Sequence, residues 1–258
     1  MIEVHNLTFG YSATEDRQIL KGVDFAAKTG KLTALIGTNG AGKSTLLKTI
    51  MGILKGKGEI SVNGKPVSQY STKDFSSTVS YLSQDNDCKV NLSVFEVVML
   101  GRMGSMSFRV SDEDIAATQE VLERLNLQGF ASRSIMELSG GQRQLVFMAQ
   151  ALVKEPKILI LDEPTSALDL HKQFDLLTLL KNLTQENDFT TLVTLHHLDL
   201  AAMFADEIIV LKEGRVYAQG APKDIFTEAM MEDVYRVRTK IYMDDKGMPH
   251  VIPLEAIY

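Results

Sequence analysis

GTNGAGKST, residues 37–45, is the stretch of sequence that decides the fold. It matches the pattern G-x-x-x-x-G-K-[ST] at every fixed position, after the predicted strand Lys31–Ile36 and at the start of the predicted helix Lys43–Met51. A glycine-rich turn in this setting lets backbone N–H groups approach phosphates closely. We expect Lys43 to contact the β- and γ-phosphates of a nucleotide and Ser44 to bind Mg²⁺. A plain glycine turn before a helix is the alternative.

KILILDEP, residues 157–164, adds acidic chemistry to this phosphate site. Its apolar run reads as a buried parallel strand, and in open α/β sheets ligands bind beyond the carboxyl ends of the strands. We expect Asp162 to bind Mg²⁺, directly or through water, and Glu163 to polarise the attacking water. The alternative is that the two acids form the N-cap pair of a helix that begins at Pro164.

MELSGGQRQ, residues 136–144, indicates a second anion site. Gly140 and Gly141 follow a serine that can cap a helix, and they precede a helical run. Glycine is unfavourable inside a helix, whereas the free N–H groups of a helix N-terminus attract anions. We therefore expect a phosphate at this helix start, with a glycine-rich helix start that binds no ligand as the alternative.

Composition excludes several classes of protein. The chain has 258 residues, a formal net charge of −6 and no long basic run, so a nucleic-acid partner is disfavoured. A single cysteine, Cys88, rules out an intrachain disulfide and suggests a reducing compartment. The N-terminus does not resemble a secretory signal. The sequence contains no run of 18 uninterrupted apolar residues, the length that a membrane-spanning helix would need.

The rest of the sequence predicts an α/β domain with a helical insertion. The predicted strands are Ile2–Tyr11, Gly22–Ala27, Lys31–Ile36, Glu59–Val62, Thr78–Ser83, Lys157–Leu161, Thr190–Leu195 and Glu207–Leu211. The predicted helices are Lys43–Met51, Val94–Leu100, Asp112–Leu125 with Ser111 as N-cap, one from near Gly141, Leu170–Thr184 and Leu198–Ala205. Ser12–Gln18 reads as a loop, Asn63–Gly64 as a hairpin turn and Asp244–Gly247 as a turn.

LSGGQ, residues 138–142, resembles the signature motif of ATP-binding cassette (ABC) ATPases. The order of phosphate loop, helical insertion, LSGGQ, acidic strand, SALD and histidine is similar to that family from Ile2 to about Val237. The resemblance implies an ATPase with a P-loop NTPase core, an antiparallel β subdomain and a helical subdomain inserted at about 85–152. Residues 1–237 would form the ABC ATPase domain, and 238–258 a short C-terminal tail that we expect to be a β-hairpin.

The resemblance also implies how ATP and Mg²⁺ are held. Two copies of the chain would pack head to tail, so that the signature of one copy caps the γ-phosphate bound by the phosphate loop of the other. The residues implied in phosphate binding are Gly37, Thr38, Asn39, Gly40, Ala41, Gly42, Lys43, Ser44 and Thr45, with Ser139, Gly140, Gly141 and Gln142 from the second copy. Asp169, the acid of SALD (166–169), would lie in the loop that crosses the dimer interface.

Three further residues take roles from the resemblance. Tyr11 would stack on adenine, with an aromatic side chain in a small core as the alternative. Gln84 would contact Mg²⁺ or the attacking water. In TLHHLDLAAMFADE, His196 would contact the γ-phosphate, and His197 stands where the family usually has Asp, so we expect it to cap a helix or face solvent. The implied catalytic group is thus Glu163, His196, Gln84 and Lys43. His5, His171 and His250 read as structural or surface residues.

Three segments are similar to the cassettes of importers for metal chelates such as iron–siderophore, haem or cobalamin. They are LSVFEVVMLGRM (92–103), HLDLAAMFADE (197–207) and GAPKDIFTEAMMEDVY (220–235). This resemblance implies a peripheral subunit on the cytoplasmic face of the cell membrane, a separate transmembrane permease and a substrate-binding protein. A non-transport ABC ATPase of the iron–sulfur assembly type and an exporter ATPase are the alternatives.

Overall fold

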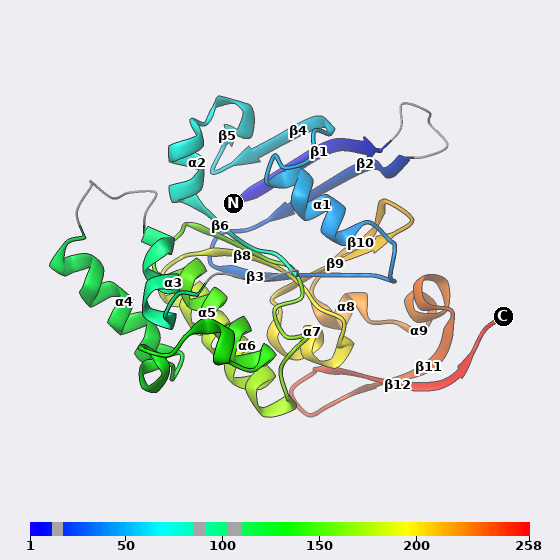
Figure 1. Cartoon of the computed structure of the whole chain (residues 1–258). Coiled ribbons are helices and arrows are strands. Elements are labelled where there is room, and N and C mark those ends of the chain that lie inside the picture. The colour runs from blue at the N-terminus through cyan, green and yellow to red at the C-terminus, as the bar shows by residue number, and fades with distance from the viewer. Residues whose placement is uncertain (12–17, 85–90, 103–109) are drawn as a thin grey trace. The chain divides into compact units, whose positions relative to one another are not determined.

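Residues 1–11, 18–84, 91–102 and 110–258 are described by the computed structural model (Figure 1). They form two compact units, one of Met1–Gln69 with Leu177–Tyr258 and the other of Tyr70–Leu176. Most of the predicted loop at Ser12–Gln18, the single cysteine Cys88, and the parts 85–90 and 103–109 of the predicted helical subdomain lie outside the described residues.

An antiparallel sheet forms the N-terminal part of the first unit. Its strands are β1 (Ile2–Gly10), β2 (Gln18–Ala27), β4 (Lys57–Val62) and β5 (Lys65–Pro66), in the order β2-β1-β4-β5. Val4 of β1 pairs with Phe25 and with Ile60. The predicted turn joins β4 to β5, and its residues Asn63 and Gly64 have φ values of 50° and 75°, as a type I′ hairpin turn requires.

Parallel strands of the first unit lead to the phosphate loop. β3 (Lys31–Ile36) pairs in parallel with β8 (Thr190–Thr194) and β9 (Glu207–Lys212), and β10 (Arg215–Gly220) is antiparallel to β9. Nearly every residue of β3 and β8 is buried, as expected for strands covered on both faces. β3 runs directly into residues 37–42, and α1 (Lys43–Ile50) follows them.

The C-terminal segment of the first unit is a chain of short elements. α7 (Leu198–Phe204) precedes β9, and α8 (Pro222–Ile225), α9 (Glu228–Met230) and the π-helical turn η6 (Met231–Tyr235) follow β10. β11 (Val237–Met243) and β12 (Pro249–Ala256) then pair antiparallel, which Figure 1 shows as the red hairpin. The Asp244 carboxylate accepts N–H bonds from Lys246 and Met248 in the turn between them.

The second unit holds most of the helices. In chain order its elements are α2 (Thr72–Thr78), β6 (Val79–Leu82), α3 (Val94–Met99), η3 (Leu100–Arg102), α4 (Asp112–Arg124), η4 (Gln128–Phe130), η5 (Ile135–Glu137), α5 (Gly140–Leu152), β7 (Ile158–Leu161) and the start of α6 (Leu170–Glu186). β6 and β7 pair in parallel, with Val79 opposite Ile158. The carboxyl ends of these two strands therefore lie next to each other, at Leu82 and Leu161.

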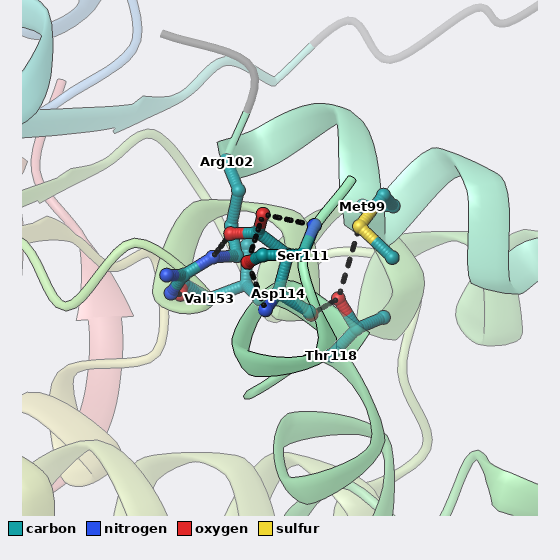
Figure 2. A network of polar contacts seen from close by, with 6 residues as sticks. All are labelled: Met99, Arg102, Ser111, Asp114, Thr118 and Val153. Carbon is teal, nitrogen blue, oxygen red and sulfur yellow. Dashed lines mark hydrogen bonds and ion pairs between the residues drawn. The ribbon is translucent and has the colours of Figure 1, made fainter. Parts of the chain in front are cut away.

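A polar network ties the helices of the second unit together (Figure 2). Arg102 donates from Nε to the Asp114 carboxylate over 2.5 Å and from Nη1 to the Val153 carbonyl over 3.1 Å. Ser111 and Asp114 form the capping box of α4. The hydrogen bond from Arg102, with those from Ser111, lowers the pKa of Asp114 to about 2. Because Arg102 ends η3 and Asp114 lies in the first turn of α4, the network links two elements that residues 103–109 separate in the sequence.

The predictions from sequence set some element boundaries wrongly and missed one helix. β2 begins at Gln18 rather than Gly22, because Gln18–Lys21 pairs with the end of β1 through β-bulges. Helix α2 was not predicted from the sequence. The strand predicted from Thr78 begins one residue later, at Val79, because Thr78 is the last residue of α2. The segment TKDFSST has no apolar periodicity. Its helix starts instead from a side-chain cap, in which the Ser71 hydroxyl accepts the Asp74 N–H.

Asp206 forms two hydrogen bonds with Leu32 in the first unit. Its Oδ2 accepts the Leu32 N–H over 2.9 Å, and its own N–H donates to the Leu32 carbonyl over 2.8 Å. Removing a carboxylate that accepts from a backbone N–H at a partly buried site costs about 2 kcal/mol. We expect Asp206→Ala to lower the free energy of unfolding by about this amount in urea titrations followed by circular dichroism, and Asp206→Asn to lower it less.

Asp175→Ala is the matched control for this prediction. The Asp175 carboxylate lies 3.0 Å from Nδ1 of His171, but the two side chains are 68% and 84% exposed. Its loss should change the free energy of unfolding by less than about 0.5 kcal/mol. Equal effects of Asp206→Ala and Asp175→Ala would mean that the Leu32 contact contributes nothing.

Candidate functional site

A buried ammonium group organises the phosphate loop. The Lys43 side chain, whose residue is 6% exposed, donates from Nζ to the carbonyls of Gly37 (2.8 Å) and Thr38 (3.1 Å). The Ala41 N–H also donates to the Thr38 carbonyl over 3.2 Å and closes the turn. The loop thus curls around the lysine at the N-terminus of α1. Ser44 and Thr45 are half-buried in the first turn of that helix.

Each glycine of the phosphate loop is favoured at its position for a different physical reason. Gly37 has a φ of 148°, and a Cβ there would lie 2.2 Å from the Leu211 carbonyl oxygen, so no other residue fits. Gly42 has a φ of 106° and packs against Leu20. Gly40 has a φ of 79° but open space around it, so only its backbone conformation favours glycine. Asn39 and Gly40 are exposed, which leaves the outer part of the loop open to a ligand.

Two other predicted residues lie in the same unit as the loop. Tyr11 is 73% exposed, and its ring meets Phe9 edge-to-face at 5.0 Å, so its alternative as a core aromatic is wrong. His196 is exposed between β8 and α7. His197 occupies the N-cap position of α7 without a capping hydrogen bond from its side chain, and it is exposed to solvent.

The acidic residues and Gln84 come together in the second unit. Gln84 follows β6 and donates from Nε2 to Oε2 of Glu163, just beyond β7, over 2.7 Å. Asp162 is 1% exposed, and its N–H donates to the Leu82 carbonyl. The parallel pairing of β6 with β7 is what brings Gln84 to Glu163, because both residues follow the carboxyl ends of these strands.

The backbone at Glu163 is unusual. Its φ of 52° lies in the left-handed region, which a residue with a Cβ occupies only a few per cent of the time. No helix begins at Pro164, since α6 starts at Leu170, so the interpretation of Asp162 and Glu163 as an N-cap pair is wrong. Such backbone conformations cluster at functional sites, where the surrounding structure holds them in place.

The signature stretch forms the N-terminus of α5. The Ser139 hydroxyl accepts the Gln142 N–H over 3.3 Å, and the Gln142 side chain accepts the Ser139 N–H over 3.0 Å, which makes a capping box. A Cβ on Gly141 would lie 2.9 Å from the Ala167 carbonyl oxygen, so this glycine is required by the chain's own packing. A Cβ on Gly140 would meet nothing within 4 Å, and Gly140 is exposed.

Asp169, the last predicted residue, caps α6. Its Oδ1 accepts the Lys172 N–H over 3.0 Å, and this hydrogen bond lowers the pKa of the carboxyl below its ordinary value. The side chain remains exposed. Sequence reasoning missed that the loop of Asp169 packs on Gly141. Only the spacing between the two motifs could have suggested the contact, because neither residue type signals it.

The predicted site residues thus form two groups. The phosphate loop, Tyr11 and His196 belong to the first unit, and the signature, Gln84, the acids and Asp169 belong to the second. Within the described residues, no three His, Cys, Asp or Glu side chains are grouped to hold a metal ion. No helix in the described part of the chain is long and apolar enough to cross a lipid bilayer.

Comparisons with known proteins place these motifs in a family. Residues 20–166 match the ABC transporter family. The chain is 37% identical to the iron(3+)-hydroxamate import ATP-binding protein of Bacillus subtilis, over 95% of this chain and 91% of that protein.

Two solved structures show the same likeness. A metal-chelate type ABC transporter in an inward-facing conformation is 29% identical, with a TM-score of 0.83 over 98% of this chain and 97% of that chain. A dimeric ATP-binding cassette in a post-hydrolysis state with ADP and Pi is 30% identical, with a TM-score of 0.77 over 86% of this chain and 98% of that chain. The fold is therefore that of the ABC ATPases, and this chain belongs to the ABC transporter family as an ATP-binding ATPase.

Proposed function

We propose that this chain is the ATP-hydrolysing subunit of an importer that takes up a metal chelate through a separate transmembrane permease. The observation that carries the proposal is the likeness, along nearly the whole chain, to a metal-chelate type ABC transporter. The hydroxamate-import relative supports the same substrate class. Iron–siderophore, haem and cobalamin are the chelates that fit it. The subunit would bind the permease at the cytoplasmic face of the membrane, and a substrate-binding protein would deliver the chelate.

Hydrolysis is assigned to the pair Glu163 and Gln84. A general base must lie within hydrogen-bonding reach of the water that it activates, and its carboxylate must be held in place. The bond from Gln84 Nε2 fixes one Glu163 oxygen, and the left-handed backbone fixes the direction in which the side chain leaves the loop. Lys43 and His196 would contact the β- and γ-phosphates, and Tyr11, exposed to solvent, offers its ring to adenine.

Oxygen donors suited to Mg²⁺ are present in both groups of residues. Mg²⁺ prefers hard oxygen ligands and, on nucleotides, uses one or two protein groups together with phosphate oxygens and water. The hydroxyl of Ser44, the carboxylate of Asp162 and the amide oxygen of Gln84 are of this kind. These residues would therefore hold the ion, which neutralises charge that develops on the transferred phosphate.

A head-to-tail dimer explains the exposed N-terminus of α5. The backbone N–H groups of its first turn and its positive helix dipole favour a phosphate. The capping box holds Ser139 and Gln142 in place. Gly140 has no side chain, and no atom in the described part of its own chain lies within 4 Å of where a Cβ would be, so another molecule has room to approach the backbone there. In the proposed dimer, the γ-phosphate of ATP on the other copy makes that approach, so ATP binding closes the dimer and hydrolysis reopens it.

Glu163→Gln tests the assigned base. The amide can still accept the Gln84 bond but cannot take a proton, so ATP binding should persist while kcat falls by about 10²- to 10⁴-fold. Nucleotide binding and phosphate release are the measurements. Glu123→Gln, an exposed acid on α4, is the control and should leave kcat unchanged. Normal turnover in Glu163→Gln would refute the assignment.

Gly140→Leu tests the dimer contact. The chain has open space at this position and an ordinary backbone conformation, so the monomer should fold and bind ATP normally. A leucine there would block the phosphate of the second copy, and the ATP-dependent dimer should disappear in size-exclusion chromatography of a Glu163→Gln background. Gly129→Leu, also in open space, is the matched control and should dimerise. ATP-dependent dimers of Gly140→Leu would show that the signature does not face a second copy.

Affinity purification from detergent-solubilised membranes of the host tests the transport role. We expect one multi-helix membrane protein to be recovered in amounts equal to the tagged chain, as judged by mass spectrometry. Its reconstitution into vesicles, with uptake of a radiolabelled ferric chelate, then distinguishes import from export. Recovery of soluble partners alone would contradict import and favour the iron–sulfur assembly alternative.

A further inference from the structure

The turn between β9 and β10 contacts the phosphate loop. Lys212 pairs with Arg215, so the turn consists of Glu213 and Gly214. Their φ values of 49° and 79° are both positive, as they are in the turn that joins β4 to β5. The Gly214 N–H donates a hydrogen bond to the Ala41 carbonyl over 3.1 Å. A turn far along the chain is therefore bonded to the loop that we expect to hold ATP.

The carbonyl of Gly214 binds strand β2. It accepts the Lys21 N–H over 2.8 Å. Gly214 is buried, and a Cβ there would lie 1.9 Å from the carbonyl oxygen of Ile19. Because that oxygen belongs to the backbone, no side-chain movement could relieve the contact, and the close approach of turn to strand requires glycine. Gly214 therefore links β2 to Ala41 through its two backbone polar groups.

The same strand and hairpin also lie against glycines of the loop. A Cβ on Gly42 would lie 3.3 Å from Cγ2 of Ile19, and a Cβ on Gly37 would lie 2.2 Å from the Leu211 carbonyl oxygen. The hairpin of β9 and β10 thus meets the loop near its start through Leu211 and near its end through Gly214. The loop carbonyls that hold the buried ammonium lie between these two contacts in the sequence.

We propose that Gly214 is a positioning residue for ATP binding, and that its turn holds the phosphate loop and β2 in the arrangement that the nucleotide needs. The inference rests on the proposed role of residues 37–45 in binding ATP. β2 pairs with β1, and Tyr11, the proposed contact of adenine, directly follows the last residue of β1. The two ends of the nucleotide would therefore be bound by parts of the chain that one glycine ties together.

Preorganisation is the physical reason for the effect. A loop that is already held in its binding conformation loses little freedom when a phosphate binds, whereas a released loop must be ordered at the expense of affinity. A side chain at position 214 would push the turn away from Ile19 and break the bonds to Ala41 and Lys21. The loop of such a variant would keep its own sequence, including the lysine, but would lose a contact that orders it.

Gly214→Asn is the test, measured as the Kd for ATP with Mg²⁺ in the full chain well below its unfolding temperature. Asparagine tolerates the left-handed backbone better than most residues, so the change adds the clash with Ile19 at little cost in backbone strain. We expect the Kd to rise about tenfold, the effect of losing the preorganisation that one or two hydrogen bonds provide. An unchanged Kd would overturn the inference.

Gly64→Asn is the matched control. Gly64 occupies the equivalent position of the turn between β4 and β5, with a φ of 75°, and a Cβ there would meet nothing within 4 Å among the described residues. The two variants share the residue change, the sign of φ and the unit, and they differ in the contact with β2 and the loop. Gly64→Asn should bind ATP as the unmodified chain does. An equal rise in the Kd of both variants would overturn the inference, because turn strain alone would then explain it.

A second measurement needs no change at Gly214. If the turn favours the loop conformation that binds ATP, then ATP must stabilise the turn by the same free energy. In Glu163→Gln, ATP should therefore slow hydrogen exchange of the Gly214 amide, resolved by NMR. The Gly30 amide, bonded to the Phe189 carbonyl at the end of β3 away from the loop, should exchange as before. Identical exchange at Gly214 with and without ATP would overturn the inference, even if Gly214→Asn failed to fold.

Lys43→Ala separates this inference from the loop assignment. It should abolish measurable ATP binding, and normal binding would refute the role of residues 37–45. Loss of binding in Lys43→Ala together with an unchanged Kd in Gly214→Asn would overturn the inference alone. A turn that merely closed the hairpin would lower the free energy of unfolding in Gly214→Asn without changing the Kd of the folded chain.

Discussion

The buried ammonium of Lys43 is the constraint on which the phosphate loop depends. A positive charge with so little exposure must be surrounded by oxygen atoms, because its transfer from water is otherwise prohibitive. The carbonyls of Gly37 and Thr38 provide them, and the chain can turn both inward only with glycine-type backbone angles at Gly37 and Gly42. Strand β3 ends directly before this loop and helix α1 begins directly after it, so these two elements hold both ends of the loop around Lys43.

The second unit holds a carboxylate beside an amide, and in the proposed mechanism this carboxylate activates the attacking water. Two parallel strands, β6 and β7, end side by side, and the residues just beyond them are Gln84 and Glu163. Their hydrogen bond links the segment that precedes residues 85–90 to the acidic strand. In the proposed mechanism, a movement of the Gln84 segment would therefore release the Glu163 carboxylate. The coupling between base and neighbouring segment needs no contact beyond this bond.

Much of this arrangement could be predicted from sequence, because phosphate loops and helix caps are local. GTNGAGKST specifies a turn and the start of a helix within nine residues, and the Ser139 capping box follows from two residues three apart. What sequence could not supply depends on partners far apart in the chain. The Gln84–Glu163 bond, the packing of Gly141 on Ala167 and the bond from Arg102 to Val153 are of this kind. Helix α2 was missed for the opposite reason, since it is polar and its only signal is a serine cap.

The two adjacent glycines of the signature differ in what excludes a side chain. At Gly141 the excluding atom belongs to the same chain, whereas at Gly140 the chain itself offers open space. Under the proposed dimer, selection on these neighbours would therefore act for separate reasons, one for folding and one for assembly. In a lineage that abandoned the paired state, Gly140 would drift to other residues, while Gly141 would stay glycine for as long as the fold persisted.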